Sequence, residues 1–293
     1  IIKYNINMVL TRRRRCNDLK NPRPTCYTKQ QLLDLVSIWN NKSNIDKIDN
    51  ITSLSKNELW IELRKRYNTV HEDLWLKDVK KTRKKKYIES FAPLVPKEWN
   101  NNPNQWLSDE DLFKAMKAYE KKYKKFLFLY PAPIDFDEKD NMGNCAWSNL
   151  CKYTYSSLSR NYNEFGAIFN THPHNKPGQH WISLFVNLKK GDIYYFDSVG
   201  DDPPEEVINL INRFKKEGDI YFKNKGKLKK VSVTINKLQH QEGNTECGVY
   251  SLFFIHHMLT DGDFSKLSKN RITDDQITKF RGYFFDDIYE IYS

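Results

Sequence analysis

Four residues in the second half of the chain carry the side chains of a thiol acyl-transfer site. Cys247 stands where turn-like sequence gives way to an apolar helical run over residues 249–258. Gln241 lies six residues upstream of it, and His180 and Asp197 come earlier in the chain. Cysteine, glutamine, histidine and aspartate supply the nucleophile, oxyanion donor, base and orienting acid that such chemistry needs. Together they indicate a cysteine peptidase.

Cys247 is the predicted nucleophile because of its place in the chain. At the first turn of a helix, the partial positive charge and free N–H groups favour a thiolate. Gly248 follows it and allows backbone or substrate to approach closely. Taken alone, a Cys-Gly pair is more often a buried structural cysteine, and only the companion residues favour the nucleophile.

His180 and Asp197 are the predicted base and its orienting partner. His180 begins an alternating strand, with Trp181 beside it to cover the site and contact substrate, and Asp197 ends the next strand 17 residues later. A carboxylate there fixes the imidazole tautomer and stabilises its cation. Gln241 is expected to donate its amide to the oxyanion with the Cys247 backbone N–H. Taken alone, His180 could be a surface histidine, Asp197 a turn residue and Gln241 a loop residue without any catalytic role.

Alternation and helical periodicity predict the elements that position these residues. Strands are expected over residues 165–170, 180–188, 193–197 and 231–238, and helices over 205–216, 247–259 and from Thr273 through Ile288. Capping-box patterns begin at Thr28, Ser55 and Ser108 and predict helices after each. Strands grouped centrally with helices on either side predict an α+β fold.

Charge and glycine content divide the 293-residue chain into two parts. Residues 1–130 carry a net charge of +13 and the remainder carries -2, while no glycine precedes Gly143. We therefore predict a basic helical N-terminal extension, 1–130, and a catalytic domain, 131–293. Basic clusters lie at 12–15, where we expect a mobile arm, at 77–86 and at 114–125. Nucleic acid is a partner that these clusters suggest, although such clusters are equally often solvated faces.

Several classes of protein are disfavoured by composition. The sequence contains no run of about 18 apolar residues, so no membrane span is predicted. Residues 1–10 are too short and too polar for a signal peptide. Met8, followed by Val-Leu-Thr, is one candidate for the start of translation, and the sequence leaves this open. Five irregularly spaced cysteines predict reduced thiols rather than a disulfide framework. A zinc site of Cys145 and Cys151 with His172 and His174 has poor ligand spacing, so neither metal nor cofactor is expected.

The motifs around these residues resemble a known family. His180–Trp181, Tyr195–Ser198 and a Gln241 separated by five residues from Cys247–Gly248 are similar to the Ulp/SENP class of cysteine proteases. Phe165–Gly166, Asn170–Thr171 and residues 177–181 resemble more closely the polyprotein proteases of large DNA viruses of the African swine fever virus type. The resemblance covers roughly residues 140–285.

The resemblance implies a papain-like α+β fold with a triad of Cys247, His180 and Asp197 and with Gln241 at the oxyanion. It further implies cleavage after small residues, commonly Gly-Gly, in viral structural polyproteins, and a location in the virion or the host cytoplasm. One alternative is a deSUMOylase or deubiquitinase acting on ubiquitin-like conjugates of the host. Another is a nucleic-acid-binding virion protein whose protease fold is incidental. The oligomeric state is left open by the sequence.

Overall fold

The computed structural model describes residues 13–17, 24–43, 46–145 and 149–286. The predictions that concern Met8, Arg12 and Ile288 lie outside these residues. The chain divides into two compact units, one formed by Ile1–Val95 with Phe284–Ser293 and the other by Pro96–Tyr283. No helix in the described part of the chain has the length and apolar character of a membrane span.

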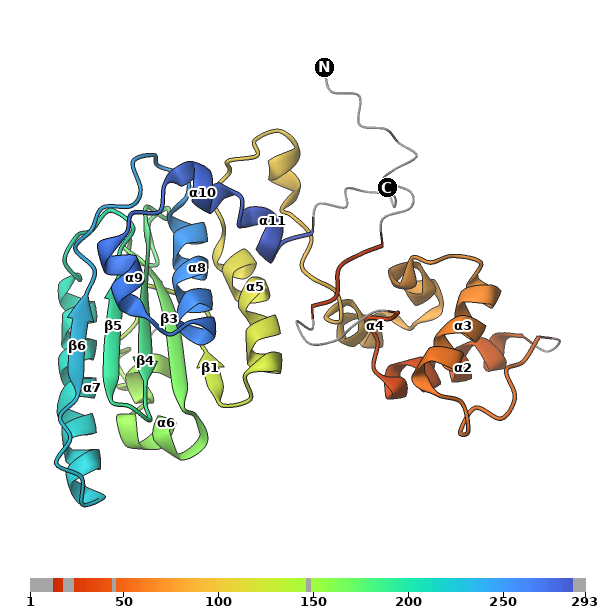
Figure 1. Cartoon of the computed structure of the whole chain (residues 1–293), viewed down its shortest axis with the longest axis horizontal. Helices are drawn as coiled ribbons and strands as arrows, with labels where there is room; N and C mark the ends of the chain where they lie inside the picture. Colours follow the sequence, from red (N-terminus) through yellow and green to blue (C-terminus); the bar gives the residue numbers. More distant parts are fainter. Residues whose placement is uncertain (1–12, 18–23, 44–45, 146–148, 287–293) are drawn as a thin grey trace. The chain divides into compact units, whose positions relative to one another are not determined.

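The first unit is helical. It contains α2 (Lys29–Lys42), α3 (Lys56–Tyr67), the 3-10 helix η1 (Glu72–Asp78) and α4 (Lys81–Ile88) (Figure 1). The capping boxes predicted at Thr28 and Ser55 are both present at the starts of α2 and α3. An aromatic core holds the helices together, with the Tyr67 ring stacked on the fully buried Trp75 at 5.6 Å.

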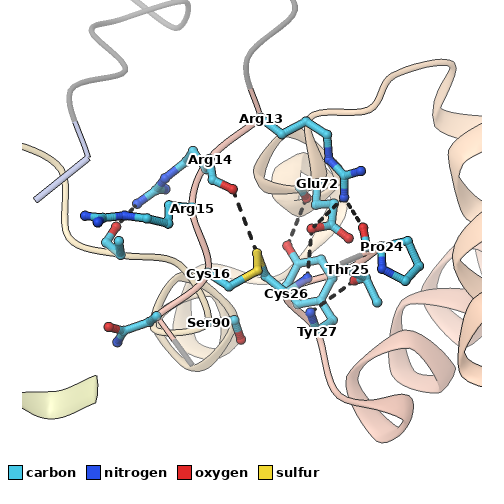
Figure 2. Close-up of a disulfide and its surroundings, with 12 residues drawn as sticks. Arg13, Arg14, Arg15, Cys16, Pro24, Thr25, Cys26, Tyr27, Glu72 and Ser90 are labelled. Atoms are coloured by element: carbon cyan, nitrogen blue, oxygen red, sulfur yellow. Dashed lines mark hydrogen bonds and ion pairs between the residues drawn. A yellow bond between two sulfur atoms is a disulfide. The ribbon is translucent and has the colours of Figure 1, made fainter. Parts of the chain in front are cut away.

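The expectation of reduced cysteines is wrong for four of the five. Cys16 is disulfide-bonded to Cys26 (Figure 2), and Cys145 to Cys151. Their Cα atoms are 4.9 and 6.2 Å apart, within the range that a disulfide spans. All five cysteines lie in the described residues, and Cys247 is the free one. The fold brings together cysteines whose spacing in the sequence had indicated no pairing.

The basic segment at residues 13–15 is held in place, contrary to the mobile arm that we expected. The Arg13 guanidinium is 3.9 Å from the Glu72 carboxylate (Figure 2), and the buried Arg14 donates a 2.8 Å hydrogen bond to the Ala92 carbonyl. A run of like charges predicts a solvated arm only when no buried acid lies within reach. Tertiary contacts supply one here.

The second unit contains one sheet and most of the remaining helices. The strands are β1 (Phe126–Phe128), β2 (Ala132–Pro133), β3 (Glu164–Asn170), β4 (Trp181–Asn187), β5 (Asp192–Phe196) and β6 (Ser232–Ile235). The α-helices are α5 (Asp109–Lys122), α6 (Tyr155–Asn161), α7 (Glu205–Asn224), α8 (Cys247–Thr260), α9 (Phe264–Lys269), α10 (Asp274–Thr278) and α11 (Arg281–Phe284). Two 3-10 helices, η2 (Lys97–Asn100) and η3 (Asn149–Lys152), complete the unit.

The sheet is mixed, with strand order β1-β3-β4-β5-β6 and with β2 also paired to β3. β3, β4 and β5 are antiparallel neighbours, while β1 and β6 add in parallel at the two edges. Because β4 and β5 run in opposite directions, the start of β4 and the end of β5 meet at the same end of the sheet. This geometry brings residues on either side of the β4–β5 hairpin together.

Alternation along the strands assigns the two faces of the sheet. Leu184 on β4 belongs to a core with residues of α6 and α7, whereas Phe196 of β5 stacks on Phe254 of α8 at 5.1 Å. Figure 1 shows α8 along the strands of this sheet, with α5 next to it. The predicted α+β class is confirmed: helices cover both faces of a central sheet. Helix α5 and strand β1 precede residue 131 and pack within this unit; the proposed division at 130/131 stays a prediction.

Some element boundaries differ from those predicted. The helix expected to end at residue 216 continues to Asn224, and the strand expected over 231–238 is limited to β6. The last helix, expected as one segment from Thr273, is broken into α10 and α11 with Lys279 as the C-cap of α10. The spacing of apolar residues predicts which side of a helix faces the core. A short break in the helix that keeps the same side inward leaves this spacing unchanged, so the break was not predicted.

Candidate active site

Cys247 is the first residue of α8 and is 2% exposed. A short loop leads into it, in which the Glu246 carboxylate accepts hydrogen bonds from the backbone and hydroxyl of Thr245. The thiol of Cys247 is close enough to the His180 ring to help raise the pKa of that imidazole. The N-terminal turn of an apolar helix therefore presents a buried thiol directly to an imidazole.

His180 and Asp197 meet at the end of the β4–β5 hairpin. His180 immediately precedes β4, Asp197 immediately follows β5, and the His180 Nε2 is 2.7 Å from the Asp197 Oδ1. The Asp197 side chain is 4% exposed, and the same oxygen accepts a hydrogen bond from the Val199 backbone at 2.9 Å. The carboxylate is thus fixed by the turn that follows the strand, which fixes the imidazole in turn.

The electrostatics of this pair favour a charged imidazole. Burial works to lower the pKa of His180, but hydrogen bonds and negative charge from Asp197 and Cys247 outweigh it and raise the pKa to about 10. At neutral pH the His180 ring is therefore protonated and positively charged, and it interacts with both the Asp197 carboxylate and the Cys247 sulfur. This is the arrangement of an imidazolium that can give its proton to a leaving group.

Gln241 is buried beside the same corner of the sheet. Its Oε1 accepts a 2.8 Å hydrogen bond from the Ser198 hydroxyl, and its Nε2 donates to the Gly243 carbonyl at 2.9 Å. The backbone N–H of Gln241 also donates to the Ser198 carbonyl. These contacts fix the amide in the loop that leads to Cys247. Among the described residues, no hydrogen bond joins the Gln241 side chain to either the His180 ring or the thiol.

Trp181 lies over the helix that carries the thiol. Its indole Nε1 donates a 2.9 Å hydrogen bond to the Leu107 carbonyl, and its backbone carbonyl accepts from Ser251 of α8 at 3.3 Å. A Cβ placed on Gly248 would be only 3.3 Å from the Trp181 ring and 3.1 Å from the Leu107 Cβ. The absence of a side chain at Gly248 therefore lets Trp181 and Leu107 approach the first turn of α8 this closely, and an added Cβ would press against both.

A cavity of about 380 Å³ opens beside this indole. Trp106, Pro131, Asn170, His174, Gly178 and Trp181 are among the residues that line it. Asn170 holds the loop that ends at His180, because its Oδ1 accepts hydrogen bonds from the backbone N–H groups of His172 and Gln179. The cavity and the His180 ring thus share one hydrogen-bonded loop.

Two parts of this site were missed in the sequence. Trp106–Leu107 was not singled out, although it directly precedes the Ser108 capping box that positions α5. Arg281 is 5% exposed and donates to the carbonyls of Gln105 and Thr245 at 2.9 and 3.1 Å. An arginine in the middle of an amphipathic C-terminal pattern had no local feature to distinguish it from a surface residue.

The two cysteines and two histidines that were considered as zinc ligands have other partners in the structure. Cys145 and Cys151 are joined to each other. The His174 Nδ1 is 2.5 Å from the Asp135 Oδ2, and the His172 ring contacts the Pro177 carbonyl. The described residues contain no group of three or more potential ligands arranged for a metal ion.

The fold and the site define the class of protein: an α+β protein of the papain-like cysteine protease fold, with its cysteine at a helix N-terminus beside a His–Asp pair. The family model of the Ulp1 protease family, C-terminal catalytic domain, matches residues 166–293. The chain belongs to this family, whose members are cysteine-type peptidases.

Individual relatives agree with this assignment. A cysteine protease of African swine fever virus is 32% identical over 189 residues, which cover 61% of this chain and 67% of that protein. A protein of Acanthamoeba polyphaga mimivirus, named as a thiol protease, is 31% identical over 62% of this chain and 57% of its own length. For the cysteine proteases of other African swine fever virus isolates, the chain spans about half of the relative's length, 46%.

A crystal structure of the same type of African swine fever virus protease has a similar fold. It superposes with a TM-score of 0.64 over 93% of this chain and 96% of that chain, at 22% identity. The superposition extends beyond the catalytic region, so the likeness of fold includes residues outside the part that the family model matches.

Proposed function

We propose that this chain hydrolyses peptide bonds with Cys247 as nucleophile, His180 as acid and base, and Asp197 as the group that orients the imidazole. The observation that carries the proposal is the 2.7 Å contact between His180 and Asp197 together with the interaction of the same imidazole with the Cys247 thiol. The thiolate attacks the substrate carbonyl, and the imidazolium gives its proton to the departing amine. Water, deprotonated by the now neutral ring, then releases the acid and regenerates the thiol.

Gln241 is proposed to support the oxyanion with the backbone N–H of Cys247. One of its two amide hydrogens is used by the Gly243 carbonyl, which leaves the second to face substrate. The Ser198 hydroxyl donates to the oxygen end of the amide and so sets which end is the donor. Preorganised donors of this kind are effective because they need no rearrangement as charge develops.

Cleavage after small residues, such as Gly-Gly-X, is the proposed specificity. The indole of Trp181 and the side chain of Leu107 lie so close to Gly248 that one added methyl would disturb them. A substrate chain that reaches Cys247 past these side chains is expected to be narrow, and glycine is the narrowest residue. Larger residues further from the scissile bond have the adjoining 380 Å³ cavity.

Processing of viral polyproteins is the biology that we favour, because the relatives named above come from large DNA viruses. The alternative substrate is a ubiquitin-like conjugate, since some African swine fever virus relatives carry the name SUMO-1 cysteine protease. The two differ in what lies upstream of the glycines: an extended polypeptide or a folded ubiquitin-like domain.

Cleavage assays with matched substrates test both levels of the proposal. Peptides of the form Gly-Gly-X should be cut by the wild-type chain and left intact by Cys247→Ala, whereas a peptide with leucine in place of the second glycine should resist. Residual cleavage by Cys247→Ala would refute the assignment of Cys247 as the nucleophile. Equal cleavage of both peptides would refute the proposed restriction to glycine-sized residues before the scissile bond. A fusion of a ubiquitin-like domain to a reporter, cut far faster than the peptide, would favour the alternative substrate.

A further inference from the structure

Helix α4 of the first unit carries an unusual density of positive charge. Residues 80–86 contain five lysines and one arginine and no acidic residue. Lys80, Lys81, Lys85 and Lys86 are exposed and Lys84 is partly exposed. Within the part of the chain that the structure describes, none of these lysines makes an ion pair or hydrogen bond through its side chain. We call Lys80, Lys81, Lys84 and Lys85 the α4 lysine surface.

The contacts that hold α4 in the unit are made by its buried side and backbone, and not by these lysine side chains. Its anchor is Tyr87, which is 3% exposed and packs edge-on against Tyr27 with ring centroids 6.0 Å apart. The Tyr87 hydroxyl donates to Asp34 at 3.3 Å, and the Gln31 amide donates to the backbone carbonyl of Lys86. The buried side of the helix holds it in the unit and leaves the lysine side chains outside.

The other two basic clusters found in the sequence are partly engaged within the protein. Arg13 contacts Glu72, as described above. On α5, Lys114 is paired with Glu110 at 3.3 Å and Lys117 with Glu120 at 2.6 Å. The cation count of the sequence suggested three equivalent clusters. In the 114–125 cluster, Lys124 and Lys125 also make no ion pair or side-chain hydrogen bond among the described residues. Of the three clusters, α4 has the longest run of such lysines, because this holds for each lysine from Lys80 to Lys86.

We propose that the α4 lysine surface binds the phosphate backbone of nucleic acid. Lys80 and Lys84, and Lys81 and Lys85, stand one helical turn apart, where like charges repel and weaken the helix. A closely spaced row of cations is matched by a ligand that carries a regular row of anions, as a nucleic acid does. Lysines contact phosphates as point charges rather than reading base edges, so binding should be independent of sequence.

The surface fits a nucleic acid better than a membrane. Ile88, at 42% exposure, is the one large apolar side chain exposed on α4. An interfacial membrane helix needs a broad apolar face in addition to its cations, and a single isoleucine does not supply one. The residues 80–86 likewise offer no aromatic side chain on which a base would stack. The ligand is therefore expected to be held by its backbone.

Binding of the full chain to a short fluorescent DNA duplex, followed by anisotropy over a salt series, tests the proposal. The test variant replaces Lys80, Lys81, Lys84 and Lys85 by alanine, which is the best helix former. The matched control replaces Lys216, Lys223, Lys225 and Lys227 of the α7 region by alanine and removes the same charge. Wild type should lose affinity steeply with salt. The test variant should weaken binding at least about tenfold and reduce the slope of log K against log salt by about three to four.

Three results would overturn the proposal. The first is equal weakening by both quadruple variants, since binding would then follow net charge and not α4. The second is an unchanged affinity in the test variant with its thermal unfolding preserved. The third is binding of phosphatidylserine vesicles or polyglutamate at least as tight as that of DNA, which would assign the surface to a membrane or an acidic protein. Peptide cleavage by the test variant should stay at the wild-type rate, so this experiment is independent of the proposed peptidase.

Discussion

The His180 Nε2 and the Asp197 Oδ1 are 2.7 Å apart although the two residues are separated by 17 positions in the chain. The antiparallel pairing of β4 and β5 makes this contact, because it places the residue before one strand next to the residue after the other. Both residues stand just outside the strands, His180 immediately before β4 and Asp197 immediately after β5.

Asp197→Asn should shift the alkaline limit of activity to lower pH. In the proposed mechanism the imidazolium is the productive form, so activity should be lost as pH rises through the pKa of His180, which is about 10 in the intact site. Asparagine keeps a hydrogen-bond acceptor but removes the negative charge that raises this pKa. The measurement is kcat/KM for a Gly-Gly-X peptide against pH. Asp202→Asn, an exposed partner of Lys237, is the control, and a shift of the same size in that variant would contradict the assignment.

Gln241→Ala should lower kcat by about 10²–10³ with little change in KM, as expected for the loss of one oxyanion donor. Ser198→Ala should produce a smaller decrease, because it removes the hydrogen bond that fixes the oxygen end of the amide. Steady-state kinetics on one peptide would compare the two. A wild-type kcat in Gln241→Ala would exclude Gln241 from the oxyanion site.

Gly248→Ala should damage the site through packing. The new methyl group would meet Leu107 at 3.1 Å and Trp181 at 3.3 Å, and overpacking of this kind costs about 1–3 kcal/mol. We expect a lower midpoint of thermal unfolding and reduced cleavage of Gly-Gly-X. Gly282→Ala is the matched control, since a Cβ there meets nothing within 4 Å. An unaffected Gly248→Ala variant would mean that the indole has room to move.

Arg281→Lys should destabilise the loop before Cys247 even though the charge is kept. Lysine cannot reproduce the fork that donates to the Gln105 and Thr245 carbonyls, and hydrogen bonds to charged groups are worth about 1.5–3 kcal/mol each. Chemical unfolding and the rate of Cys247 alkylation should both report the change. Arg271→Lys provides the comparison, because that side chain is 37% exposed and also donates to a backbone carbonyl. Equal effects in both variants would argue against a special role for Arg281.

His256 should make the protein less stable in mild acid. Burial first, and then the neighbouring charges of His257 and Lys122, lower its pKa from 6.5 to about 4. Between these values the unfolded chain binds a proton that the folded chain excludes, so stability falls as pH falls from 6.5 toward 4. One proton corresponds to about 1.4 kcal/mol per pH unit. His256→Gln should flatten the pH dependence of the unfolding free energy by that amount.

The control for His256 is its hydrogen-bond partner. The Tyr119 hydroxyl lies 2.8 Å from the His256 Nδ1, so Tyr119→Phe should lower stability without changing its slope against pH. If the slope in His256→Gln remains that of wild type, another group is responsible for the acid sensitivity.

The sequence by itself determined the elements that depend on near neighbours. The capping boxes at Thr28, Ser55 and Ser108 predicted where α2, α3 and α5 begin, because a cap is satisfied within four residues. Alternating side chains predicted β3, β4 and β5, since the two faces of these strands pack against different helices. The same local patterns predicted that His180, Asp197 and Cys247 lie at the ends of strands or helices.

Only the tertiary structure decided which distant residues meet. Trp181 donates to the carbonyl of Leu107, 74 positions away, and Arg281 reaches Gln105 across 176. The pairing of Cys16 with Cys26, and the pairing of residues 13–14 with buried acids and carbonyls, likewise depend on chain segments that converge only on folding. Local propensity and periodicity describe how each segment folds, but a long-range contact depends on how all segments pack, and so no local pattern encodes it.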